Sequence, residues 1–308
     1  MTRGRLLVLA LGAVAVAGLL VPAPADAGPS VPAGAITPTT IDPAALEGLP
    51  SSSTPAAGTG ERSPAPTPEG VPDSAPGSPT PEAVIGTDER TRVRPTTSYP
   101  ARAIVHIVVD SLNSSDFSCT GWMIAKDALA TAAHCADYSG PAVYTLIPGR
   151  NGGSQPFRSC NPTATGVVVS DSWFASGGNG PSEDDYAAFD LNCKVGKDTG
   201  WLGFRQLSDG KLDGLKETIA GYPADKPSGQ QWKSKNKISS VNQDQVFYKN
   251  DTFGGMSGGP VYRNFGLPCG TCAVAIHTAA IGNPATQNTG TRIRPEVGQF
   301  LNEVAGRP

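Results

Sequence analysis

The sequence predicts an all-β fold made of two small barrels and a short C-terminal helix. Beyond Tyr99 the chain is a series of short apolar runs separated by Gly, Pro, Asn and Asp, which is typical of barrels and sandwiches. No longer segment with helical periodicity occurs before Pro295–Val304, where we expect the helix. The length of the chain from residue 83 to 308 suits two small barrels side by side.

The expected strands can be followed along the chain from the run at 102–109, which is rich in β-branched residues and reads RAIVHIVV. Further short apolar runs lie at 121–124, 142–147, 166–169, 186–191, 218–222, 245–248, 260–262 and 273–277. We expect barrel one at about 100–200, barrel two at about 201–292 and the helix at about 295–305.

The N-terminus has the pattern of a secretory signal peptide at residues 1–27. Arg3 and Arg5 precede an apolar run at 6–21, and residues 25–27 (ADA) form a small-residue cleavage site. An uncleaved anchor helix is the alternative, which the short apolar run disfavours. We therefore expect a secreted, extracellular protein.

Residues 28–82 differ in composition from everything after them. Fifteen of the 29 prolines lie between Pro22 and Pro81, and no Phe, Tyr or Trp occurs before Tyr99. A stretch so poor in large apolar residues cannot bury a core. We interpret 28–82 as a low-complexity pro-segment, with a solvated linker as the alternative, and 83–308 as the mature domain of a zymogen.

The charge of the chain excludes two classes of partner. The whole chain carries a net charge of −3, but three Arg and seven acidic residues lie before residue 83, so the mature domain carries only +1. A nearly neutral domain offers no electrostatic surface for nucleic acid or an anionic membrane. No apolar run outside the N-terminus is long enough to span a bilayer.

Six cysteines in an exported chain indicate three disulfides, although six cysteines allow 15 pairings. Cys119 and Cys135 bracket a hairpin-like stretch, so we pair them. Cys269 and Cys272 form a C-x-x-C that precedes a strand and lacks the further ligands of a zinc site, which favours a small bridge. That leaves Cys160 with Cys193, and the pairing of these last four cysteines stays open.

Two segments contain candidate catalytic residues. His134 lies in residues 129–135 (LATAAHC), and Ser257 lies in the glycine-rich segment 251–261 (DTFGGMSGGPV). Glycines around a serine suit a nucleophile on a tight turn, because they let the backbone approach a substrate carbonyl closely. His106 lies inside an apolar strand, and we expect it to be structural.

Residues 131–135 (TAAHC) and 255–260 (GMSGGP) resemble the two hallmark motifs of the chymotrypsin-like serine proteases. Further likeness is to their V8-like branch, the bacterial glutamyl endopeptidases. It extends to residues 83–93 (AVIGTDERTRV), which are similar to the mature N-terminus of those enzymes, and to 251–252, 277–278 and 290–293. The resemblance covers 83–308 and implies two six-stranded antiparallel β-barrels.

The resemblance implies a catalytic triad of His134, Asp185 and Ser257. The hydroxyl of Ser257 is a weak nucleophile that needs His134 as its base, and an acid must hold the imidazole. That acid lies between 134 and 257 in the chain. Asp185 directly precedes a strand, as in the family, and the other candidates are Asp137, Asp171, Asp184 and Asp190.

The N–H groups of Gly255 and Ser257 are implied to form the oxyanion hole. Met256 stands where pancreatic-type proteases carry an Asp that receives the new N-terminal ammonium, so that activation salt bridge should be missing. In V8-like enzymes the new amino terminus, here that of Ala83, helps to bind the acidic side chain of the substrate. An inactive homologue that only binds a partner is the alternative.

Three residues are expected to set the specificity. Thr252 would line the pocket, and His277, after the strand at 273–276, would donate a hydrogen bond to a carboxylate, which favours Glu over Asp before the cut. Ala83 would contribute its amino group. The rival is Asp251, which by linear count could select Lys or Arg.

Glu82 directly precedes the expected mature N-terminus, so a Glu-specific enzyme could release itself there. We expect protein or peptide substrates, a monomer, no cofactor and no metal. No D-x-D-x-D-G calcium loop occurs in the sequence.

Overall fold

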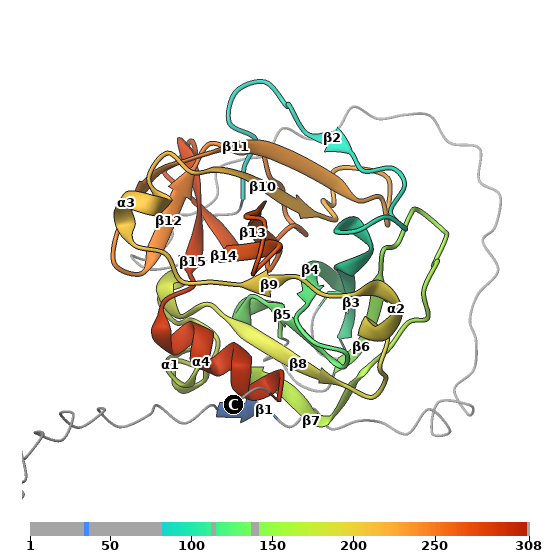
Figure 1. Cartoon of the computed structure of the whole chain (residues 1–308). Helices are drawn as coiled ribbons and strands as arrows, with labels where there is room; N and C mark the ends of the chain where they lie inside the picture. The colour runs from blue at the N-terminus through green and yellow to red at the C-terminus, as the bar shows by residue number, and fades with distance from the viewer. Residues whose placement is uncertain (1–33, 37–81, 112–114, 137–141, 307–308) are drawn as a thin grey trace, which may run out of the picture. The chain divides into compact units, whose positions relative to one another are not determined.

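The structure, a computed structural model, describes residues 34–36, 82–111, 115–136 and 142–306 (Figure 1). The expected signal peptide and most of the pro-segment lie outside the described residues.

The first sheet has seven antiparallel strands that curl without closing into a ring. Its order is β1 (Gly34–Ile36), β7 (Pro162–Val169), β8 (Ala187–Leu191), β5 (Ala128–Thr131), β4 (Phe117–Met123), β3 (Ile104–Ser111) and β6 (Ala142–Pro148). In the described residues β6 and β7 form no ladder with each other; a single bridge joins Leu146 to Cys160 at this opening. One expected barrel is therefore a curled half-barrel.

The second sheet closes. Its order is β10 (Lys216–Gly221), β13 (Pro260–Asn264), β14 (Thr271–Ile281), β15 (Gln287–Arg292), β12 (Gln245–Tyr248), β11 (Trp232–Val241) and β2 (Thr91–Arg92), and β10 also pairs with β11. The ring of six strands has β2 on its outside, and β9 (Gly203–Phe204) pairs parallel with β14. Closure removes free sheet edges, which would otherwise pair with other chains.

Helices are few and short. They are α1 (Asp171–Ala175), α2 (Gly196–Thr199), α3 (Asp209–Leu212) and the longer α4 (Pro295–Val304), with 3-10 turns at Ala101–Ala103, Ala133–Cys135 and Ser182–Asp184. Pro295 at the first turn of α4 suits a helix start, because its missing N–H would be unpaired there anyway. The mostly β architecture with a short C-terminal helix that the sequence predicts is confirmed.

Helix α4 follows the second sheet in the chain but packs on the first, across β8 (Figure 1). Its Phe300 meets the ring of Tyr186 edge to face, with centroids 5.0 Å apart. Tyr186 directly follows Asp185, so the helix supports the loop that holds this acid.

Each sheet has its own apolar interior. Trp122, Leu129 and Phe189 are fully buried in the first, and Ile219, Ile238 and Val261 in the second. Burial of each such side chain contributes roughly 1.5–3 kcal/mol. The cysteines form the disulfides that we expected from the sequence, namely Cys119–Cys135, Cys160–Cys193 and Cys269–Cys272.

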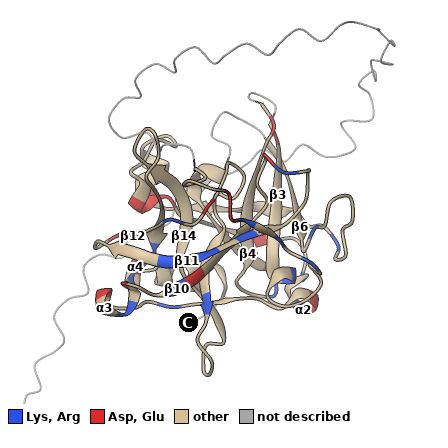
Figure 2. Cartoon of the chain, turned by 90° about the horizontal axis from the view of Figure 1, so that it is seen from above, with Lys and Arg blue, Asp and Glu red and all other residues tan. Residues whose placement is uncertain are grey.

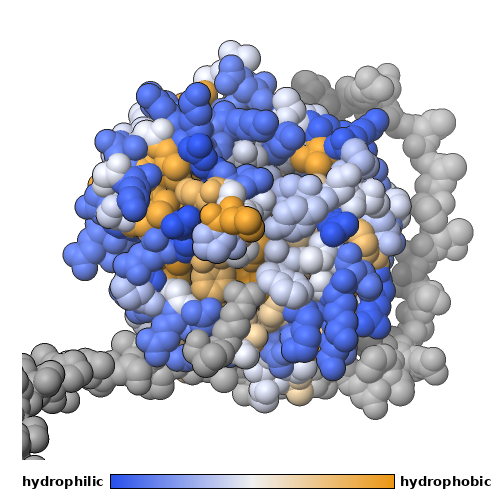
Figure 3. Space-filling model, in the orientation of Figure 1, coloured by the Kyte–Doolittle hydropathy of each residue, from blue (hydrophilic) through white to orange (hydrophobic). Residues whose placement is uncertain are grey.

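The surface carries both signs of charge. Basic and acidic residues are interspersed over the ribbon, with several basic bands on β11 (Figure 2). On the face in Figure 3, apolar residues form separate patches between hydrophilic ones. Among the described residues, no helix has the length and apolar character needed to cross a membrane.

Candidate active site

Strand pairing in the first sheet brings His134 next to Asp185. His134 lies in the 3-10 turn after β5, Asp185 lies just before β8, and these two strands pair with Thr131 opposite Ala187. The backbone N–H of His134 donates to Asp185 Oδ1 at 2.9 Å, and its ring Nδ1 lies 2.6 Å from Oδ2. Asp185 is fully buried, so its carboxylate is committed to this imidazole.

Two opposing effects act on the His134 ring. Burial lowers the pKa of this imidazole, but the charge of Asp185 and its hydrogen bond outweigh the burial and raise the pKa above its usual value. The side chain stays 29% exposed on its other side. This arrangement suits a base that must carry a proton during a reaction.

Ser257 lies on a turn that only glycines can form. Gly255 has a φ of +98°, and Gly258 has a φ of +79° with so little space that a Cβ would meet the hydroxyl oxygen of Thr131. The N–H of Thr120 donates to Ser257 O at 2.8 Å, and its hydroxyl donates to Gly255 O at 2.8 Å. Strand β4 of the first sheet therefore fixes the turn that lies between β12 and β13 of the second sheet.

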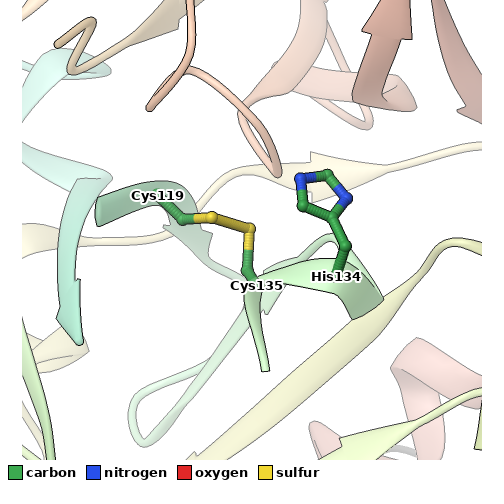
Figure 4. A group of neighbouring side chains, drawn as sticks. All are labelled: Cys119, His134 and Cys135. Carbon is green, nitrogen blue, oxygen red and sulfur yellow. A yellow bond between two sulfur atoms is a disulfide. The ribbon is translucent and has the colours of Figure 1, made fainter. Parts of the chain in front are cut away.

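The disulfide Cys119–Cys135 lies at the same junction. Figure 4 shows it next to the His134 ring, which projects from the turn that also carries Cys135. The sulfur and nitrogen atoms of these three residues lie within 4.8 Å of one another. Because both sulfurs are bonded in the disulfide, neither offers the thiolate that a metal ion needs, and the group supports the fold instead.

Among the described residues, the N–H groups of Gly255 and Ser257 have no hydrogen-bond acceptor. In the described part of the chain neither donates to a protein acceptor, whereas the neighbouring Met256 and Gly258 donate to Phe253 O and His277 O. Two free donors on a rigid turn can receive a negatively charged oxygen.

A second imidazole, that of His277, lies on β14 and is fully buried. The hydroxyl of Tyr248 lies 2.7 Å from its Nδ1 and donates to Thr289 O at 2.8 Å. Tyr248 has only one hydroxyl proton, so its oxygen accepts from Nδ1–H of His277. The opposite nitrogen, Nε2, is thus aimed away from Tyr248.

The side chain of Glu82 fills the space between His277 and Ser257. Its Oε1 accepts a hydrogen bond from the Ser257 hydroxyl at 2.5 Å and lies 3.4 Å from His277 Nε2. In the described residues Ser257 forms no hydrogen bond with His134, because the Ser257 hydroxyl donates its hydrogen bond to Glu82 instead. Glu82 is only 7% exposed although it belongs to the expected pro-segment.

Burial dominates the protonation of this second pair. It raises the pKa of Glu82 to about 8 and lowers the pKa of His277 to about 3. At neutral pH the contact is therefore between a carboxylic acid and a neutral imidazole, although the 3.4 Å distance would also fit an ion pair.

Ala83, the residue after Glu82, is held by hydrogen bonds of its backbone. Its N–H donates to Asn288 Oδ1 at 3.1 Å, and its carbonyl accepts from Asn288 Nδ2 at 2.7 Å and from the N–H of Thr252 at 3.1 Å. The hydroxyl of Thr252 is also directed at this carbonyl, at 3.5 Å.

Asp251 has a structural role in the N-terminal segment. Its Oδ1 accepts from the N–H of Ile85 at 2.9 Å and its Oδ2 from the N–H of Glu89 at 2.7 Å. The residue is 3% exposed. Both oxygens are used, so this carboxylate is not offered to a basic substrate side chain.

The other acids that we considered as third triad member lie elsewhere. Asp184 pairs with Arg294 at 2.9 Å, Asp190 accepts from Thr163 at 3.2 Å, and Asp171 begins α1. Asp137 lies outside the described residues.

His106, which we expected to be structural, is buried away from these groups. Its Nδ1 is 3.0 Å from Arg150, and its ring stacks on Tyr222.

Sequence reasoning missed Asn288 and Tyr248. Neither belongs to a motif that we recognised, and each contacts its partner only through pairing of β12, β14 and β15. The one usable signal was a buried Asn in a strand, which needs hydrogen-bond partners and is depleted there.

Comparison with known proteins gives a consistent result. A model of the trypsin family matches residues 93–299. A glutamyl endopeptidase of Bacillus licheniformis is 39% identical over 225 residues, covering 70% of this chain and 67% of the relative. A Bacillus subtilis protein named extracellular metalloprotease is 36% identical over 224 residues, covering 70% and 68%. A solved structure of a Glu endopeptidase in complex with MPD has a TM-score of 0.64 and 26% identity, covering 73% of this chain and 100% of that one.

Proposed function

Since the chain belongs to the trypsin family and is a serine endopeptidase, we propose that it is secreted and cleaves peptide bonds after Glu, and less readily after Asp. The observation that carries the specificity is the buried approach of a glutamate carboxyl to His277 Nε2, at 3.4 Å. A glutamate side chain, that of Glu82, lies buried between Ser257 and His277.

The pocket has the chemistry that an acidic side chain requires. Tyr248 and Thr289 fix the ring of His277, so that Nε2 faces the incoming carboxyl. A glutamate enters as the neutral acid or with a proton on His277, and in both cases one proton lies between the two groups. A lysine or arginine would meet only an imidazole there.

Asp251 gives no support to the rival trypsin-like specificity. Its carboxylate is occupied by the N–H groups of Ile85 and Glu89, and a buried carboxylate with two such donors has no need of a further cation.

For the reaction we propose the triad His134, Asp185 and Ser257. The Ser257 hydroxyl attacks the scissile carbonyl while His134 takes its proton, and the imidazolium then protonates the leaving amine. Asp185, which accepts from Nδ1 and from the backbone N–H, holds the ring in the required tautomer. Water then hydrolyses the acyl-enzyme by the same path.

The negative charge that develops on the substrate carbonyl would be received by the N–H groups of Gly255 and Ser257. Neither N–H has an acceptor in the part of the chain that the structure describes, which supports this role. Loss of one such donor typically lowers kcat by about 10²–10³-fold.

We further propose that maturation cuts between Glu82 and Ala83, in agreement with a pro-segment at 28–82. The new ammonium of Ala83 would stay at Asn288 Oδ1, next to the emptied pocket, and attract the carboxylate of a substrate. The N-terminal sequence pattern supports export, and protein or peptide substrates follow from the family.

The test uses three peptides that differ only in the residue before the scissile bond: Glu, Gln or Arg. We expect kcat/KM for Glu to exceed that for Gln by at least about 10-fold, the value of one charge-assisted hydrogen bond. Faster cleavage after Arg would contradict the proposal. Failure of a fluorophosphonate to label Ser257 in the mature protein would instead favour a non-catalytic binding protein.

A further inference from the structure

The orientation of Glu82 is the reverse of that of a substrate. A substrate places its peptide carbonyl at the nucleophile and extends its side chain into the pocket. Here the side-chain carboxyl of Glu82 meets the Ser257 hydroxyl at 2.5 Å, while the peptide nitrogen of Ala83 donates to Asn288 Oδ1. The carboxyl group therefore takes the place of the scissile carbonyl.

The nitrogen of the bond between Glu82 and Ala83 is also engaged by a residue other than the catalytic base. During cleavage His134 must give its proton to the leaving nitrogen. The nitrogen of Ala83 is instead committed to Asn288 Oδ1, and the carbonyl of Ala83 is held by Asn288 Nδ2 and the N–H of Thr252.

The chain beyond Ala83 makes this arrangement rigid. Asp251 accepts from the N–H groups of Ile85 and Glu89, and Arg90 is bound to Asp88 and Asp225. Turning the bond at 82–83 towards Ser257 would break the hydrogen bonds of Ala83 before any could replace them.

We propose that the uncleaved chain blocks its own active site with the Glu82 side chain, and that the bond between Glu82 and Ala83 is cut by a second, mature copy of the protein. This inference rests on the proposed specificity for Glu. Glu82 thus has two successive roles, first as an occupant of its own pocket and then as the residue recognised in the pocket of another molecule.

The cleavage step balances without any further reactant than water. Ser257 of the mature copy bonds to the carbonyl carbon of Glu82, the C–N bond to Ala83 breaks, and the serine proton passes through His134 to the nitrogen of Ala83. Water then releases Glu82 as a free carboxylic acid and restores the serine. The new amine takes up a proton from solution and becomes an ammonium at Asn288.

The first test measures how the rate of maturation depends on concentration. Uncleaved wild-type protein is diluted over a hundredfold range, and conversion is followed by gel electrophoresis and N-terminal mass spectrometry. We expect a lag that shortens when mature enzyme is added, and a half-time that lengthens in proportion to dilution. Full-length Ser257→Ala protein, which cannot cut itself, should be cut after Glu82 by added mature enzyme. A half-time independent of dilution would overturn cleavage by a second copy.

The second test measures the block itself with two full-length variants that a Glu-specific enzyme should leave uncut. Glu82→Gln keeps a side chain that fills the pocket and accepts from Ser257, whereas Glu82→Ala leaves the pocket open. A tethered group acts at an effective concentration on the order of millimolar, so fluorophosphonate should label Glu82→Ala at least about 10-fold faster. Equal labelling rates would overturn the block.

The two tests also separate this inference from the proposed specificity. If the mature enzyme fails to prefer Glu in the peptide series, the specificity is wrong, and the labelling comparison still decides whether Glu82 blocks Ser257. If the enzyme prefers Glu and both variants label equally, only the block is wrong.

Discussion

The candidate active site contains two carboxyl–imidazole pairs that differ in protonation. In Asp185–His134 the pair is joined by two hydrogen bonds, and the acid raises the pKa of the imidazole. In Glu82–His277 the groups are 3.4 Å apart, and burial suppresses the charge of both.

The difference comes from the hydrogen bonds that each carboxyl receives. Asp185 has a donor on each oxygen, both from His134, so burial costs it little. Glu82 has only the Ser257 hydroxyl on Oε1, and its Oε2 has no partner among the described residues. The Asp185–His134 pair suits a permanent contact, whereas the site at His277 suits an acidic side chain that binds and dissociates.

Breaking the first pair should have the largest effect. Asp185→Asn removes the charge that favours a protonated His134 and permits the wrong tautomer, so we expect kcat to fall by about 10⁴-fold. The matched control is Asp190→Asn, an exposed acid of the same segment that accepts from Thr163; its loss should change kcat by less than about 5-fold. Steady-state kinetics on the Glu peptide measure both, and similar losses in the two variants would refute the assignment.

Breaking the Glu82–His277 type of contact should alter substrate selectivity rather than the reactivity of Ser257. In mature His277→Gln we expect the kcat/KM ratio of Glu over Gln peptides to fall by about 10–100-fold, because the buried carboxyl of the substrate loses its partner. Fluorophosphonate labelling of Ser257 should change little. The control is His106→Gln, which alters the other buried histidine and should keep the ratio. An unchanged ratio in His277→Gln would remove His277 from the pocket's function.

A smaller change should follow when only the support of His277 is removed. Tyr248→Phe deletes the hydroxyl that fixes Nδ1, a neutral hydrogen bond, so we expect the Glu-over-Gln ratio to fall by about 2–10-fold. A positioning role predicts a changed pH dependence of this ratio, since the tautomer of His277 is no longer fixed. A lower melting temperature with the ratio and its pH profile intact would mean that Tyr248 is only structural.

The smallest effect concerns pH and the uncleaved chain. The pKa of Glu82 is raised from 4.5 to about 8 in the pocket, so its contribution to stability is complete below pH 4.5 and is lost as pH rises towards 8. We expect the melting temperature of full-length Ser257→Ala to fall by at least about 2–4 °C between pH 5 and pH 8.5, relative to Ser257→Ala with Glu82→Gln. Parallel curves for the two proteins would show that Glu82 does not lie protonated in the pocket.

The sequence was most informative where function depends on local geometry. The glycines around Ser257 and the short segment with His134 could be recognised from the sequence, because tight turns restrict the residue types that can form them. Helix α4 was predicted at Pro295–Val304 and is found there, since an amphipathic helix begun by proline is a local signal.

What could not be predicted depends on contacts between residues far apart in the chain. Ser257 and Glu82 are 175 residues apart, and Ala83 and Asn288 are 205 apart, so no window of sequence contains either pair. The open first sheet was missed for a similar reason, because closure depends on pairing between distant strands: the edges are β1 and β6, and β1 pairs with the free side of β7. The sequence suggested Glu82 as a cleavage site but gave no sign that its side chain enters the pocket.

Helix α4 and the arginine before it bear on when the enzyme can become active during synthesis. Arg294 binds Asp184 and the carbonyl of Glu183, and Phe300 packs on Tyr186, so the loop of Asp185 is supported from residues made much later. Arg294 follows Asp184 by 110 residues. A nascent chain that already contains the first sheet, or even Ser257, still lacks Arg294 and Phe300. The order of translation thus postpones a supported Asp185 loop until residues 294–300 have been made.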